Sequence, residues 1–103
     1  TFAWDLATAS VAAVASLEKG RDDAYGIFHA TNSGVTSWHG FAQKIFELAG
    51  VTKADLSPIP TEAYPTPAPR PAYSVLNCDR LEQVFQVRLP DWREALSRCI
   101  ACL

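Results

Sequence analysis

The sequence predicts an α/β fold, a small and mostly helical lobe with about four helices and two or three short strands. Apolar residues recur at helical spacing in four segments, and in one short segment they alternate as in a half-buried strand. Prolines gather between residues 58 and 71, where their missing N–H groups exclude a central strand. Because 103 residues is the size of one domain, we expect residues 1–103 to form a single lobe.

The first helix is expected over residues 5–19. Asp5 suits its first turn, because an acidic side chain is favourable near a helix N-terminus, and Gly20 suits its end. The residues at helical spacing that predict this helix are Leu6, Ser10, Ala13, Val14 and Leu17.

Residues 25–31 are expected to follow as a short strand. Phe28 and Ala30 would face one side of it and Ile27 and His29 the other, which is the pattern of a half-buried strand. The turn-forming residues TNSG close this segment.

A second helix is expected after Ser37, whose hydroxyl suits the N-cap, and it ends at Gly50, which suits a left-handed C-terminal position. Residues 56–59 and 73–76 are then expected to be extended, one on each side of the proline-rich segment. The apolar face of the second helix comprises Trp38, Phe41, Ala42, Ile45 and Ala49.

Two further helices complete the predicted fold. Asn77 or Asp79 opens a short one. Pro90 suits the first position of the last helix, because an N–H group at that position has no hydrogen-bond acceptor within the helix. The apolar stripes are Leu81, Val84 and Phe85 in the short helix and Trp92, Ala95, Leu96, Cys99, Ile100 and Leu103 in the last.

Composition excludes several classes of partner. A net charge of -2 offers no basic face to a nucleic acid. No apolar run approaches the roughly 20 residues that cross a bilayer, and no signal-peptide pattern opens the chain. We therefore expect a soluble, cytoplasmic protein that binds neither nucleic acid nor membranes.

Cysteine and histidine side chains are the candidate metal ligands in this sequence. Cys99 and Cys102 lie at helical spacing and could supply half of a zinc site, but nothing in the sequence places His29 or His39 beside them. We expect no metal site. Three cysteines cannot all pair within one chain, so we expect Cys99 and Cys102 to be reduced and packed.

Arg70 lies in the segment PTPAPRP, residues 65–71. Such a segment is an inert spacer, a ligand for proline-binding modules, or a stiff loop that presents one cation to an anion. On residues alone an exposed arginine is most often paired with a nearby carboxylate or with water. The three interpretations stay open at this point.

Four segments in order, TFAWDLA, GIFHATNSGVTSWHGFAQKIFELAG, PIPTEAYPTPAPRPAYSVLN and RLPDWREAL, resemble the C-terminal part of the dTDP-4-dehydrorhamnose reductase family. The members of this family are extended short-chain dehydrogenases/reductases that act in dTDP-L-rhamnose biosynthesis. The resemblance covers nearly the whole chain. It implies the substrate-binding part of such an enzyme, with dTDP-4-dehydro-6-deoxy-L-mannose as ligand.

In this family an N-terminal Rossmann domain binds NADPH, and a Tyr-x-x-x-Lys pair supplies the proton. None of Tyr25, Tyr64 and Tyr73 is followed four residues later by lysine, and no glycine cluster follows a strand in dinucleotide-binding spacing. We therefore expect the Rossmann domain to be absent from this chain. We also expect no bound cofactor, no catalytic residue and no reduction by the chain alone.

The resemblance assigns Arg70 to the diphosphate of a dTDP-sugar, since a guanidinium can hold a diphosphate with two parallel hydrogen bonds. Tyr73 could face the same ligand, although a tyrosine in a strand is more often packed. Thr1 and Phe2 match a loop that lies near the nucleotide in related enzymes, although Phe2 is equally suited to a core. Pro69 stands where the family usually has a second arginine.

A rival interpretation is a stand-alone interaction or dimerisation module derived from this family. The proline run would then be a recognition element, or the apolar face that the Rossmann domain covers in the family would form a homodimer.

Overall fold

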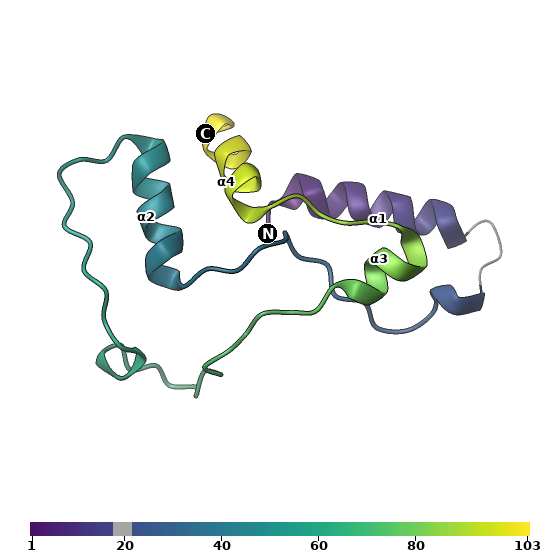
Figure 1. The fold of residues 1–103 in the computed structure, drawn as a ribbon, viewed down its shortest axis with the longest axis horizontal. Helices are drawn as coiled ribbons and strands as arrows, with labels where there is room; N and C mark the ends of the chain where they lie inside the picture. Colours follow the sequence, from purple (N-terminus) through teal and green to yellow (C-terminus); the bar gives the residue numbers. More distant parts are fainter. Residues whose placement is uncertain (18–21) are drawn as a thin grey trace. The chain divides into compact units, whose positions relative to one another are not determined.

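The computed structural model describes residues 1–17 and 22–103. This part of the chain contains four α-helices and two short 3₁₀ helices (Figure 1), so the four predicted helices are confirmed. In chain order they are α1 (Ala3–Leu17), η1 (Asp22–Ala24), α2 (Trp38–Ala49), η2 (Thr61–Ala63), α3 (Asp79–Phe85) and α4 (Trp92–Ala101). The chain divides into two compact units, one of Thr1–Val35 with Leu76–Leu103 and one of Thr36–Val75.

α1 begins at Ala3, slightly before the predicted start, because the carbonyl of Phe2 accepts hydrogen bonds from the N–H groups of Asp5 and Leu6 at 3.1 and 3.2 Å. Asp5 lies in the first turn, as predicted. The hydroxyls of Thr8, Ser10 and Ser16 each donate to the carbonyl four residues earlier, so the polar side chains of this alanine-rich helix are satisfied locally. The predicted end at Gly20 falls outside the described residues.

The buried side of α1 differs from the predicted stripe. Asp5 and Ala9 are buried, whereas Leu6 and Val14 are 42% and 55% exposed. The small side chain of Ala9 lets α3 approach closely, so it lies against Leu81 in the core of the first unit. That core consists of Ala9, Leu81 and Leu89, with Phe28, Ala30, Phe85 and Val87 packed around it.

α3 opens at Asp79, which is one of the two predicted starts. The side-chain oxygen of Asn77 accepts a hydrogen bond from the Asp79 N–H at 2.7 Å, so the other candidate serves as a local acceptor. The ring of Phe85, at the end of α3, packs on Phe28 with a centroid distance of 5.0 Å and a tilt of 60°. This tilted aromatic pair ties α3 to the segment before the TNSG turn.

α4 starts at Trp92, so the prediction that Pro90 occupies the first helical position is wrong. The Asp91 carboxylate caps the helix by accepting a hydrogen bond from the Arg93 N–H at 2.8 Å. The carbonyl of Pro90 accepts instead from the N–H of Ser33 at 2.9 Å. Ala95 and Leu96 of the predicted stripe are buried, whereas Leu103 is 98% exposed.

The predicted strands are wrong: within residues 1–17 and 22–103 the only sheet-like pairing is an isolated parallel bridge between Ser33 and Asp91. Residues 25–31 keep the predicted alternation, because Phe28 and Ala30 are half-buried while Ile27 and His29 are exposed. No second strand pairs with this segment in the described chain. The carbonyls of Tyr25 and Ile27 accept from the guanidinium of Arg80 instead, at 2.8 and 3.0 Å. In residues 56–59 and 73–76 the neighbouring prolines cannot donate to a ladder.

The second unit contains α2, and both ends of this helix were predicted correctly. The Ser37 hydroxyl accepts from the Gly40 N–H at 3.1 Å, and Gly50 adopts the left-handed conformation with a φ of 66°. None of the described side chains of α2 is fully buried: Phe41 and Ile45 are half-buried and Trp38 is 80% exposed. Beyond α2, η2 is the only regular element in residues 51–75.

Candidate functional site

The four residues expected to bind the ligand fall into two pairs. Thr1 and Phe2 belong to the first unit, where they precede α1. Arg70 and Tyr73 belong to the second, on the proline-rich segment. Each pair has its own local surroundings.

Phe2 is held at the start of α1 by its backbone. Its N–H donates a hydrogen bond to the side-chain oxygen of Asn32 at 2.8 Å. Its ring is half-buried, with the guanidinium of Arg98 5.4 Å from the ring centroid. Thr1 is exposed. The loop before α1 is therefore anchored at Phe2, and Thr1 extends from that anchor into solvent.

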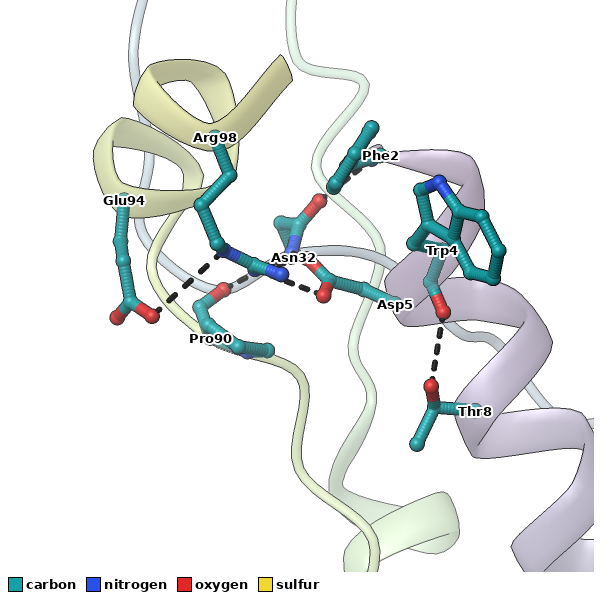
Figure 2. Close-up of polar contacts among 8 residues, drawn as sticks. All are labelled: Phe2, Trp4, Asp5, Thr8, Asn32, Pro90, Glu94 and Arg98. Atoms are coloured by element: carbon teal, nitrogen blue, oxygen red, sulfur yellow. Dashed lines mark hydrogen bonds and ion pairs between the residues drawn. The ribbon is translucent and has the colours of Figure 1, made fainter. Parts of the chain in front are cut away.

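Asn32, in the TNSG turn, is the buried centre of this region. Figure 2 shows its amide between the start of α1 and the segment before α4. The amide nitrogen donates to Asp5 Oδ2 at 2.8 Å and to the carbonyl of Pro90 at 3.1 Å. One side chain thus connects three segments that are far apart in the sequence.

Asp5 and Arg98 complete the network (Figure 2). The Nη2 atom of Arg98 lies 2.7 Å from each carboxylate oxygen of Asp5, and its Nε lies 3.8 Å from Glu94 on the same helix. Burial raises the pKa of Asp5, but the hydrogen bonds from Arg98 and Asn32 and the charge of Arg98 outweigh it. The pKa of this carboxyl therefore lies below its usual value, and Asp5 is an anion at neutral pH.

Sequence reasoning missed this network. In the sequence alone, Asn32 is a turn residue, Asp5 is a favourable charge in the first helical turn, and Arg98 has no predicted role. The signal that could have revealed it is an acidic residue four positions before Ala9 on an alanine-rich helix face, because a buried carboxylate needs a cation or several donors.

Arg70 is exposed, and its side chain makes no hydrogen bond or ion pair with the described residues. The four other arginines in the described ranges all have partners: Arg80 binds carbonyls, and Arg88, Arg93 and Arg98 lie near carboxylates. Pro69 and Pro71 flank Arg70 and restrict the backbone on both sides. This guanidinium is therefore available to an external anion.

Tyr73 lies three residues after Arg70 and is 73% exposed. Within the second unit, Tyr73 is therefore not a half-buried tyrosine that packs against its neighbours. A phenol this exposed can donate a hydrogen bond to a ligand or lie against an aromatic base.

No group of three or more histidine, cysteine, aspartate or glutamate side chains that could hold a metal ion occurs in the described ranges. Cys78, Cys99 and Cys102 are free thiols. Among the described residues, no helix is both long and apolar enough to cross a membrane.

The first unit also contains an open apolar hollow of about 270 Å³ beside α1 and α3. Ser10 is the only residue with a polar side chain among those that line it, so it offers a ligand shape but little polar specificity. The remaining lining residues are Ala9, Ala13, Leu17, Ala24, Phe28, Ala30, Leu81 and Phe85.

Comparison with known proteins identifies the family of this chain. Residues 1–103 match the family described as the RmlD substrate binding domain, and the chain belongs to this family. It is 45% identical over 82 residues to the dTDP-4-dehydrorhamnose reductase of Burkholderia thailandensis, and this alignment covers 73% of this chain and 28% of that protein. The family inferred from the four sequence segments is therefore confirmed.

Two further relatives carry the same name. The dTDP-4-dehydrorhamnose reductase of Sinorhizobium fredii is 44% identical over 85 residues, covering 79% of this chain and 28% of that protein. That of Escherichia coli is 40% identical over 85 residues, covering 78% of this chain and 28% of the relative. The aligned part of the chain thus spans little more than a quarter of the length of these relatives.

Proposed function

We propose that residues 1–103 form the nucleotide-sugar-binding lobe of a dTDP-4-dehydrorhamnose reductase in dTDP-L-rhamnose biosynthesis. The proposed ligand is dTDP-4-dehydro-6-deoxy-L-mannose. One observation carries the proposal: in a chain of a substrate-binding family, Arg70 is exposed between two prolines and has no partner among the described residues. The names of the relatives supply the identity of the proposed sugar.

The proposed role of Arg70 is to hold the diphosphate. A guanidinium presents several donors in a rigid plane and can give two parallel hydrogen bonds to phosphate oxygens. Tyr73, on the same segment, would contact the ligand beside it, and Thr1 and Phe2 would lie near the nucleotide. Binding energy gained at the diphosphate would be used to orient the sugar ketone for reduction.

Reduction of the ketone in the family uses NADPH, and the residues present here do not fit that cofactor. A dinucleotide site needs a glycine-rich turn between a strand and a helix. Within the described ranges no strand precedes a helix. Gly34 packs closely against Asp91 and Trp92, where an added Cβ would meet both residues, so the packing at the start of α4 accounts for this glycine. We propose that residues 1–103 bind the sugar nucleotide without binding the cofactor.

Two measurements on residues 1–103 test the proposal. In an NMR titration with dTDP, the signals of Arg70 and Tyr73 should shift, and thymidine, which lacks the diphosphate, should shift Arg70 much less. Unchanged spectra at millimolar dTDP would remove the claim that this lobe binds nucleotide by itself. NADPH mixed with the chain and a dTDP-4-keto sugar should not be consumed. Oxidation of NADPH at an enzymatic rate would contradict the proposal that residues 1–103 bind the sugar nucleotide without binding the cofactor.

A second candidate is a dimerisation module. The observation that favours it is an exposed apolar stripe on α1, where Trp4 and Val11 are 69% and 70% exposed and Val14 is 55% exposed. A helix that is apolar on several sides is usually covered. Sedimentation equilibrium distinguishes the candidates, because a dimer that persists on dilution supports this role and a monomer supports a binding lobe.

A further inference from the structure

We propose that Asn32 is a positioning residue for the nucleotide, because it sets the place of the Phe2 backbone from which the Thr1–Phe2 loop meets the ligand. This inference rests on the proposed function. It assigns a role to a residue of the TNSG turn that would not itself touch the sugar nucleotide.

The contacts of Asn32 point in two directions. Its side-chain oxygen accepts from the Phe2 N–H at 2.8 Å, and its nitrogen donates to Asp5 Oδ2 at 2.8 Å and to the Pro90 carbonyl at 3.1 Å. The amide is buried, with 9% of its surface exposed. Because both donor hydrogens and the acceptor are used, the orientation of the amide is fixed, and so is the point at which Phe2 is held.

The partners of Asn32 are themselves fixed. The Asp5 carboxylate is held by the guanidinium of Arg98, at 2.7 Å from each oxygen. Pro90 lies beside the bridge in which Ser33 pairs with the start of α4: the Ser33 N–H donates to Pro90, and the Trp92 N–H donates to Ser33, both at 2.9 Å. The acceptor for Phe2 therefore belongs to a rigid frame rather than to a mobile loop.

Phe2 needs such an acceptor. Its N–H precedes the first helical residue, where no carbonyl of α1 can accept it. Without Asn32 this N–H would turn to water, and Phe2 would be held only through its carbonyl and its ring, so the position of the backbone before α1 would be less well defined. A ligand that meets the loop would then have to order it on binding, which lowers affinity.

The test compares Asn32→Ala and Asn32→Ser with Asn77→Ala. A serine keeps a polar side chain that is too short to reach the Phe2 N–H. Asn77 is the matched control, because its side chain also accepts from a backbone N–H, at Asp79, but lies far from the loop in sequence and has no proposed role in binding. Circular dichroism first establishes the fraction of each variant that is folded. The dissociation constant for dTDP is then measured by NMR on the folded chain, together with hydrogen exchange at the Phe2 amide.

Loss of the Asn32 hydrogen bond should raise the dissociation constant by about tenfold, with faster exchange at Phe2, whereas Asn77→Ala should leave both unchanged. A merely structural role would lower the unfolding temperature without changing the affinity of folded molecules. Wild-type affinity in a folded Asn32 variant, or unprotected exchange of the Phe2 amide in the unaltered chain, would overturn the role of Asn32 and leave the proposed function intact. Absence of dTDP binding by the unaltered chain would overturn the proposed function and this inference with it.

Discussion

The Nη2 atom of Arg98 lies 2.7 Å from both carboxylate oxygens of Asp5, although 93 residues separate the two in sequence. The pair joins the first turn of α1 to α4, and the loop that carries Thr1 and Phe2 leaves from the same place. An ion pair between the two ends of the chain therefore supports the part of the first unit to which a binding role is assigned.

Removing the charge of Asp5 should weaken the fold. In Asp5→Asn the shape is kept, but the amide has one acceptor oxygen where the carboxylate has two, and its NH2 group would meet the Arg98 guanidinium, which is also a donor. We expect the free energy of unfolding to fall by about 1 to 3 kcal/mol, toward the lower figure because Arg98 is partly exposed to solvent. Urea unfolding followed by circular dichroism measures it.

Asp55→Asn is the matched control for that experiment, because Asp55 is exposed and makes no hydrogen bond or ion pair with the described residues. It should change stability by no more than about 0.5 kcal/mol. Equal losses in the two variants would show that the Asp5 network does not stabilise the fold.

Stability should also fall in acid. The pKa of Asp5 is lower in the folded chain than its ordinary value of 3.8, so the unfolded chain takes up the proton first as the pH falls. The contribution of Asp5 is thus complete above the unfolded pKa and is lost as the pH drops through the folded one. Urea midpoints measured across this acid range should decline more steeply for the unaltered chain than for Asp5→Asn. Parallel declines would contradict the lowered pKa.

Gly34 should tolerate substitution poorly. Its φ is 84°, and an added Cβ would lie 2.5 Å from Asp91 Oδ2 and 2.8 Å from Trp92 Cδ1. Gly50 has a similar φ of 66° but nothing within 4 Å of the same position. Both alanine variants carry the backbone strain of roughly 1 kcal/mol, and only Gly34→Ala adds a clash with the start of α4. Thermal unfolding should therefore show the larger loss for Gly34→Ala, and equal losses would mean that the contact relaxes freely.

The helices were predictable where the decisive residues are local. Ser37 and Gly50 define both ends of α2 by contacts within a few residues, and the sequence shows both. The strands were not predictable from their alternation, because a strand requires a partner and alternation records only which side chains are buried. The carbonyls of residues 25 and 27 are satisfied by Arg80, more than 50 residues away, and no local pattern reveals that contact.

The candidate site divides in the same way. Arg70 and Tyr73 stand out locally because of the prolines around them and the family they resemble, and the structure adds that both are exposed. No local sequence pattern singles out Asn32 or Arg98. Their importance comes from hydrogen bonds across long sequence separations, which only the folded chain reveals.

The dissociation constants of dTDP for Arg70→Ala and for Arg88→Ala decide whether Arg70 holds the diphosphate. Arg88 is an equally charged control whose side chain is 71% exposed and lies 3.9 Å from Glu82. Loss of charge-assisted hydrogen bonds predicts a dissociation constant for Arg70→Ala that is higher by roughly tenfold to a hundredfold, with Arg88→Ala close to the unaltered chain. Equal affinity in Arg70→Ala and the unaltered chain would show that Arg70 does not hold the diphosphate.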